Sequence, residues 1–192
     1  STVSGGPSPS GYRREDENSW HWIARSIGVG TSLSTAIGSA NNVSAPSNFA
    51  EYMNADTNPF GTSVYISFHS NGSTGNPATA TARGVLGLVD SDQGTPNQTA
   101  LANYTGGQIN DDMMALNGMF EHTWFNRNTH SLAGGFGEID LGSGAEMDAT
   151  IVEVGFHDNT QDSQLLRDPR VRDQIARSTY VATLQYFDAR IR

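Results

Sequence analysis

One segment, residues 149–156, constrains the fold more than any other part of the sequence. It reads Ala-Thr-Ile-Val-Glu-Val-Gly-Phe and is almost continuously apolar. A run of this length without polar alternation is typical of a strand that is buried on both faces. Such strands belong to α/β proteins, in which helices cover the sheet. The segment therefore predicts a strand of an α/β sheet, and Glu153 is the single carboxylate inside it.

Helical patterns occur in four other segments. In the first, Trp20, Ile23 and Ile27 fall at three- and four-residue steps and share one face. Three acids, residues 15–17, are placed in the first turn of this helix, where the helix dipole favours them. Gly28 and Gly30 are both candidates to close it. The predicted helices are residues 15–28, 47–53, 95–120 and 168–187, with Ser47, Pro96 and Pro169 at the starts of the last three.

Two segments have strand character. Residues 63–67 are rich in β-formers and lead to a turn at Asn71-Gly72, and residues 83–89 lie between two polar loops. Because strands alternate with helices along the chain, we expect an α/β fold with helices on both faces of the sheet. Residues 1–11 are rich in Ser, Gly and Pro and are expected to form a flexible N-terminal segment.

The composition excludes several classes of function. The formal net charge is -9, and all 11 basic residues are arginines that form no cluster, which argues against nucleic-acid binding and against a polybasic membrane anchor. No apolar run approaches the ~20 residues of a membrane span. The absence of cysteine excludes disulfides, thiolate metal ligands and cysteine nucleophiles. The chain of 192 residues suits one domain, residues 1–192, and its polar, Lys-free composition favours an exported bacterial protein.

Two short motifs contain the residues that bear on chemistry. His69 follows a predicted strand, at the edge of the sheet where sites usually form, although a lone histidine is more often structural. Glu153 is costly to bury without a partner. Burial would also raise its pKa, as suits a general acid or base, while a structural ion pair with an arginine is the alternative.

Taken together, the two motifs resemble those of the zinc-dependent N-acetylmuramoyl-L-alanine amidases. Residues 67–71 (Ser-Phe-His-Ser-Asn) are similar to the family's Ser-x-His-x-Asn motif, and residues 153–159 to its Glu-x-Gly-Phe-x-x-Asn motif. Arg83-Gly84 and residues 136–138 (Phe-Gly-Glu) fit a branch of the family found in large secreted bacterial proteins. The resemblance extends from about Tyr12 to Phe187.

The resemblance implies a fold, a metal and a substrate. The family has a twisted, mostly parallel or mixed sheet flanked by helices, and whether this chain contains the family's first strand stays open. One zinc ion is held by two histidines and a glutamate, of which His69 matches one histidine, and Glu153 matches the general base that later donates a proton. The substrate is peptidoglycan, cut between N-acetylmuramic acid and L-alanine, with Asn71 and Arg83 expected to contact it. Such a protein is secreted, or acts in the periplasm or cell envelope.

The glutamate ligand of the zinc has three candidates. Glu15 fits the family position first. Asp16 takes that position if the helix is aligned by residues 23–25, and Glu17 shares a helix face with His21 one turn later. The alternative is that all three acids are only favourable charges in a first turn.

The family's other histidine ligand, within Gly-His-Gly-Gly, has no counterpart in residues 1–11. Catalytic zinc normally has three protein ligands and a water, so His21 and His157 stay open as substitutes. Two functions follow, a zinc-dependent amidase or a non-catalytic peptidoglycan-binding module on the same scaffold. The order of the motifs disfavours a third, a metal-dependent peptidase.

Overall fold

The structure is a computed structural model that describes residues 18–28, 44–54, 60–73, 76–140 and 147–191. Its strands are β1 (Val64–Asn71), β2 (Leu86–Asp90), β3 (Ser131–Gly134) and β4 (Asp148–Phe156). They form a four-stranded sheet in the order β1-β4-β2-β3. β4 runs parallel to β1 and antiparallel to β2, and β2 runs parallel to β3. The predicted α/β class with a mixed sheet is therefore confirmed.

Strand β4 confirms the prediction made from the apolar run. All of its residues except Val154 are buried, because β1 and β2 flank it and packed side chains cover both of its faces. Strand β1 extends beyond the predicted residues 63–67 because its pairing with β4 continues to Asn71. His69 consequently lies within the strand and not after it.

The helices of the described chain are α1 (Ser19–Ile27), α3 (Ala45–Met53), α4 (Gln98–Ala115), α5 (Thr160–Arg167) and α6 (Pro169–Ile191). The predicted start of the first helix at residue 15 is wrong. The side chain of Asn18 accepts a hydrogen bond from the backbone N–H of His21 at 2.7 Å, so Asn18 is the N-cap and no acid lies in the first turn. Of the two glycines predicted to close this helix, Gly28 ends it, with a φ of 86°.

The other helices also differ from the predictions. Helix α4 is shorter at both ends than the predicted residues 95–120, so Pro96 lies before its start, and α6 continues beyond the predicted residue 187. Helix α3 begins at Ala45 instead of Ser47, whose hydroxyl donates to the carbonyl of Ser44 within the first turn. Helix α5 was not predicted as a separate element. It begins where the Asn159 side chain accepts from the N–H groups of Gln161 and Asp162, and Pro169 starts the next helix directly after it.

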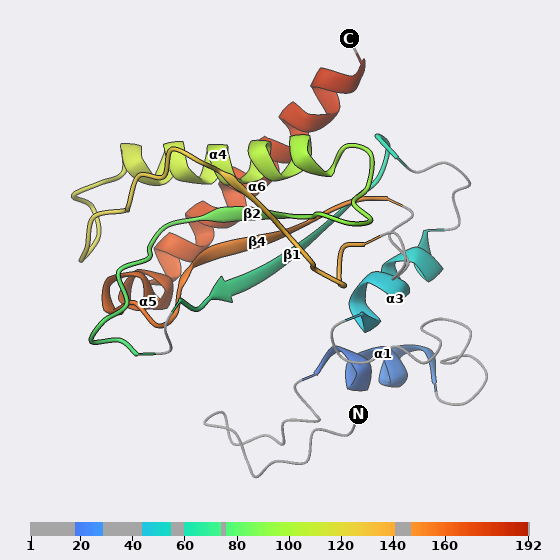
Figure 1. Cartoon of the computed structure of the whole chain (residues 1–192), viewed down its shortest axis with the longest axis horizontal. Helices are drawn as coiled ribbons and strands as arrows, with labels where there is room; N and C mark the ends of the chain where they lie inside the picture. The colour runs from blue at the N-terminus through green and yellow to red at the C-terminus, as the bar shows by residue number, and fades with distance from the viewer. Residues whose placement is uncertain (1–17, 29–43, 55–59, 74–75, 141–146, 192) are drawn as a thin grey trace.

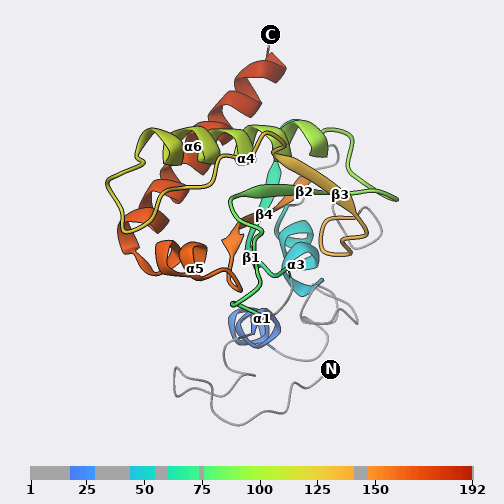
Figure 2. The same ribbon diagram turned by 60° about the vertical axis from the view of Figure 1, so that its left-hand side comes forward.

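Helices α4 and α6 form a layer on one side of the sheet. α4 packs on β2 and β4, and α6 packs along α4; Figures 1 and 2 show both helices on the same side. Ile109 and Met113 of α4, Val152 of β4 and Ile175 of α6 belong to one buried cluster. This cluster is the main core, and it fixes which side chains of β1 and β4 face the helices.

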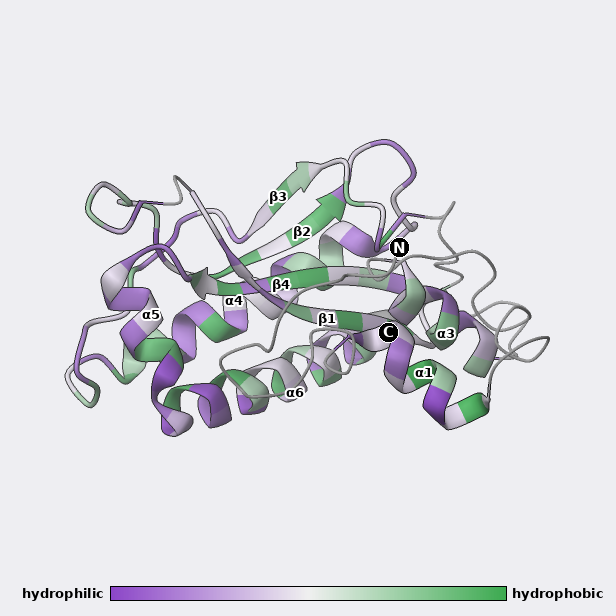
Figure 3. Cartoon of the chain, turned by 90° about the horizontal axis from the view of Figure 1, so that it is seen from below, coloured by the Kyte–Doolittle hydropathy of each residue, from purple (hydrophilic) through white to green (hydrophobic). Residues whose placement is uncertain are grey.

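The other face of the sheet carries a second apolar cluster and several polar side chains. Leu88 of β2 and Ile151 of β4 pack there against Ile139 and Phe136 from the segment before β4. Figure 3 shows the hydrophobic stretches of β1, β2 and β4 lying side by side. Helices α1 and α3 pack together on this side, toward one end of the sheet.

No strand precedes Val64 in the described part of the chain. The expected flexible segment, residues 1–11, lies outside the described residues, so that expectation stays untested. No helix among the residues that the structure describes combines the length and apolar character of a membrane span.

Candidate active site

His69 and Glu153 lie side by side although they are remote in sequence. They are register partners on the adjacent parallel strands β1 and β4, and partner residues of parallel strands project to the same face of a sheet. That face is the one without α4, because Val152, next to Glu153, points into the α4 cluster. The expected convergence of the two motifs at one sheet surface is therefore present.

The carboxylate of Glu153 is buried and incompletely partnered. The residue is 9% exposed, and its Oε2 atom accepts no hydrogen bond within the described structure. Burial raises the pKa of Glu153, the positive charges of protonated His69 and His157 oppose this, and the nearby charge of Glu138 adds to the increase. A carboxyl group with a raised pKa is suited to exchange protons near neutral pH.

A second buried carboxylate, Glu138, belongs to the same surface. Its Oε2 atom lies 2.9 Å from Nε2 of His69, and its Oε1 accepts a hydrogen bond from the hydroxyl of Tyr65 at 2.7 Å. From the sequence, Glu138 is part of a motif typical of one branch of the family, and no role is predicted for it. Because His69 and Glu138 are 69 residues apart in the chain, their contact becomes visible only in the fold.

The segment that delivers Glu138 is anchored at both sides. The N–H of Phe136 donates to Oδ2 of Asp90 at 2.7 Å, at the end of β2. Ile139 is fully buried, and its carbonyl accepts from the side chain of Gln98 at 2.8 Å. These contacts hold the backbone on either side of Glu138 against the sheet.

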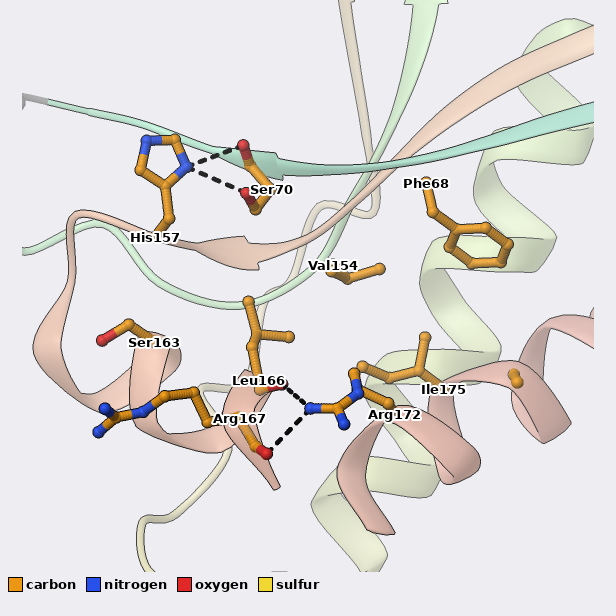
Figure 4. A pocket seen from close by; sticks show the side chains of 10 residues that line it. Phe68, Ser70, Val154, His157, Ser163, Leu166, Arg167, Arg172 and Ile175 are labelled. Carbon is orange, nitrogen blue, oxygen red and sulfur yellow. Dashed lines mark hydrogen bonds between the residues drawn. The ribbon is translucent and has the colours of Figure 1, made fainter. Parts of the chain in front are cut away.

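The carboxyl ends of β1 and β4 are joined through His157. Its N–H donates to the carbonyl of Asn71 at 2.9 Å, and its Nδ1 lies 3.0 Å from the carbonyl oxygen of Ser70. Figure 4 shows the ring turned toward Ser70. The side chain of Asn71 accepts from the N–H of Gly72 at 2.8 Å, which shapes the turn after β1.

A largely apolar pocket of about 490 Å³ lies beside these strand ends. Phe68 of β1 and Val154 of β4 line it together with Leu166 and Ile175 (Figure 4). Phe68 and Val154 flank His69 and Glu153 in sequence and therefore project to the opposite face of the sheet. The pocket is thus separated from the His69–Glu153 surface by the sheet itself.

Arg83 has structural partners in the fold. Its Nε donates to Oδ1 of Asp162 and its Nη2 to the carbonyl of Thr123, each at 2.8 Å. The side chain is only 11% exposed. Its guanidinium holds α5 and a loop together, so the structure offers a packing role for Arg83 where sequence reasoning expected a substrate contact.

The donor types at the His69 surface fit zinc, which accepts imidazole and carboxylate ligands. The described residues, however, contain no group of three histidine, aspartate or glutamate side chains placed to hold one metal ion. Within the described residues, neither His21 nor His157 therefore completes a three-ligand set with His69. The acidic candidates Glu15, Asp16 and Glu17 lie outside the described residues.

Comparison with known protein families gives one match. The family model described as N-acetylmuramoyl-L-alanine amidase matches residues 39–185. This region contains both His69 and Glu153, whereas the acids at residues 15–17 precede it. No curated protein sequence matches the chain.

Solved structures with the same fold include several amidases. The N-acetylmuramoyl-L-alanine amidase AmiC2 of Nostoc punctiforme aligns with a TM-score of 0.57 and 19% identity, covering 96% of this chain and 90% of its own. An N-acetylmuramoyl-L-alanine amidase from Clostridium difficile 630 aligns with a TM-score of 0.55 and 16% identity, covering 98% and 91%. The CwlD amidase from Clostridioides difficile aligns with a TM-score of 0.52 and 14% identity. This match covers 74% of this chain and 64% of that amidase.

These similarities at low identity establish a shared fold, and the family match spans most of the chain. The two motifs meet at one face of the sheet within the matched region. This chain therefore belongs to the N-acetylmuramoyl-L-alanine amidase family.

Proposed function

We propose that this chain hydrolyses the amide bond between N-acetylmuramic acid and L-alanine in bacterial peptidoglycan. The observation that carries the proposal is the buried Glu153 carboxylate, whose Oε2 has no hydrogen-bond partner in the described structure and which is the register neighbour of His69. Such a group is poised to take a proton from a water molecule. Because the substrate is cell wall, we place the protein outside the cytoplasm, secreted or in the cell envelope.

His69 is the proposed zinc ligand among the described residues, and Glu15 is the first candidate for a second ligand. When bound, zinc supplies a Lewis acid that lowers the pKa of water and polarises a carbonyl. Glu153 takes a proton at a carboxylate oxygen and holds it in a desolvated environment. It then returns that proton to the amine of L-alanine as the amide bond breaks, so its raised pKa serves both steps. Asn71 lies at the end of β1 beside this surface and is the proposed substrate contact.

Replacing Glu153 by Gln tests the proposal. Glu153→Gln keeps the size of the side chain but cannot exchange the proton, so we expect hydrolysis of muramoyl-peptides to fall by about 10²–10⁴-fold while the zinc content stays unchanged. Release of free amino termini from purified peptidoglycan measures the rate. Glu121→Gln is the matched control, since that side chain is 70% exposed. Wild-type rates in Glu153→Gln would contradict the proposal.

A second function is a peptidoglycan-binding module without catalysis. The absence of a three-ligand cluster among the described residues favours it. It requires that the wild-type chain sediments with insoluble peptidoglycan, contains no stoichiometric zinc and releases no amino termini. The same preparations therefore separate the two functions.

A further inference from the structure

Glu138 is a buried acid that contacts the proposed zinc ligand His69. The residue is 4% exposed, and a buried carboxylate is costly unless each oxygen is satisfied. Among the residues that the structure describes, its partners are a tyrosine and a histidine, Tyr65 and His69, both from β1. A purely structural acid would gain more from a permanent cation, whereas the described partners of Glu138 include the proposed zinc ligand His69.

The Tyr65 hydroxyl is a fixed donor to Glu138. Its oxygen lies 2.7 Å from Oε1 of Glu138. Burial, followed by the hydrogen bond and the charge of Glu138, raises the pKa of Tyr65 well above its ordinary value. The phenol therefore keeps its proton and holds one oxygen of Glu138 in place. The other oxygen, Oε2, is left to face His69.

The contacts of His69 determine which ring nitrogen carries the proton. Nε2 lies 2.9 Å from Oε2 of Glu138 and 3.2 Å from the hydroxyl of Ser67. An ionised carboxylate only accepts hydrogen bonds, so Nε2 is the nitrogen that donates. In the neutral ring the remaining nitrogen, Nδ1, then carries a lone pair.

We propose that Glu138, held by Tyr65, is a positioning residue that keeps the proton of His69 on Nε2 and presents Nδ1 as the metal-binding atom. The proposal rests on the proposed function to the extent that His69 is a zinc ligand. A ligating histidine commonly donates its second ring N–H to a carboxylate, which fixes the tautomer and makes the ligand more basic. Because Oε2 of Glu138 contacts Nε2 of His69, we assign Glu138 to the orientation of the ligand.

The tautomer of His69 is measured first, in metal-free protein at about pH 8. Long-range ¹H–¹⁵N spectra distinguish a protonated nitrogen from one with a lone pair, and the loss of a signal in His69→Ala assigns it. We expect Nε2–H in the wild type. A ring protonated on Nδ1 would overturn the inference. This arm requires neither catalysis nor zinc.

Metal binding is measured next, with zinc itself in competition with a chromogenic chelator. Glu138→Gln is expected to weaken zinc binding by about 10–100-fold, and Tyr65→Phe to weaken it less, with Glu121→Gln unchanged. In ¹¹³Cd-loaded protein the coupling should appear at Nδ1 of His69. Unchanged zinc affinity in Glu138→Gln, or coupling at Nε2, would reject the positioning role.

The two proposals fail separately. Zinc bound through Nδ1 without release of amino termini from peptidoglycan would support the role of Glu138 and reject the amidase activity. Hydrolysis that depends on Glu153, in a protein whose His69 is protonated on Nδ1, would do the reverse.

Discussion

Asp162 is a buried carboxylate where the start of β2, the end of β4 and α5 meet. It is 1% exposed and accepts hydrogen bonds from the N–H of Gly84 at 2.8 Å, the N–H of Phe156 at 3.1 Å and the Nε of Arg83 at 2.8 Å. Asp162→Ala leaves the two buried N–H groups without this acceptor and Arg83 without its carboxylate partner. We expect the free energy of unfolding to fall by about 3–5 kcal/mol, as measured by urea denaturation.

An exposed ion pair provides the control for that substitution. Asp173 contacts Arg177 at 2.7 Å, but its side chain is 62% exposed. Asp173→Ala should therefore change the free energy of unfolding by less than about 1 kcal/mol. Equal losses in the two variants would show that burial of Asp162 does not set the size of the effect.

Asp90 makes the stability of the protein depend on pH. Burial alone would raise its pKa, but the N–H groups of Gln93, Phe136 and Asp92 donate to the carboxylate and together lower the pKa below its ordinary value. A lowered folded-state pKa means that the ionised form stabilises the fold. This contribution is complete above the unfolded-state pKa of about 3.9, and it is lost as the pH falls through the folded-state value.

Asp90→Asn should consequently be less stable than the wild type at pH 7, with the difference shrinking below about pH 4. Urea denaturation at pH 7 and pH 3 measures both free energies. A difference that grows on acidification would contradict the assigned direction of the pKa shift. Because Phe136 lies two residues before Glu138, a loosened loop should also weaken the Glu138–His69 contact.

Helix α4 approaches strand β2 more closely than ordinary side chains allow. A Cβ atom added at Gly87 would lie 2.5 Å from the carbonyl oxygen and 2.8 Å from the Cα of Ala102. Gly87→Ala must therefore shift the helix relative to the sheet, and we expect a loss of about 1–3 kcal/mol. Gly135→Ala is the control, since a Cβ there meets nothing within 4 Å. Thermal unfolding of the two variants measures the difference, and similar melting temperatures would show that the α4–β2 contact adapts freely.

Zinc should stabilise the folded chain as a whole, if it binds the native state and not the unfolded one. At a free zinc concentration about 100 times the Kd, the gain is about 2.7 kcal/mol, which corresponds to a rise in melting temperature of roughly 5–10 °C for a chain of this size. His69→Ala should abolish the rise. A stabilisation that persists in His69→Ala would place the metal elsewhere in the protein.

Elements whose side chains follow a simple period or an unbroken apolar run can be predicted from the sequence alone. β4 is predicted almost to the residue, and α4 and α6 to within a few residues at their starts, because burial of their apolar positions is the dominant local signal. The motifs around His69 and Glu153 can also be recognised in the sequence, because residue type and order are enough to indicate them. The strand β3 was not predicted, because its four residues carry too little pattern. The start of α1 was predicted wrongly, because a side-chain cap at Asn18 sets the boundary of the helix.

The contacts between these residues follow from the three-dimensional fold. Parallel pairing of β1 with β4 sets His69 beside Glu153, and the anchored segment before β4 brings Glu138 to His69. The same packing brings Arg83 into an ion pair with Asp162. Contacts of this kind depend on strand order and register, which arise when the sheet and α4 bury their apolar faces together. No local pattern in the chain encodes them, so the sequence indicated the chemical groups and the fold assigned their partners.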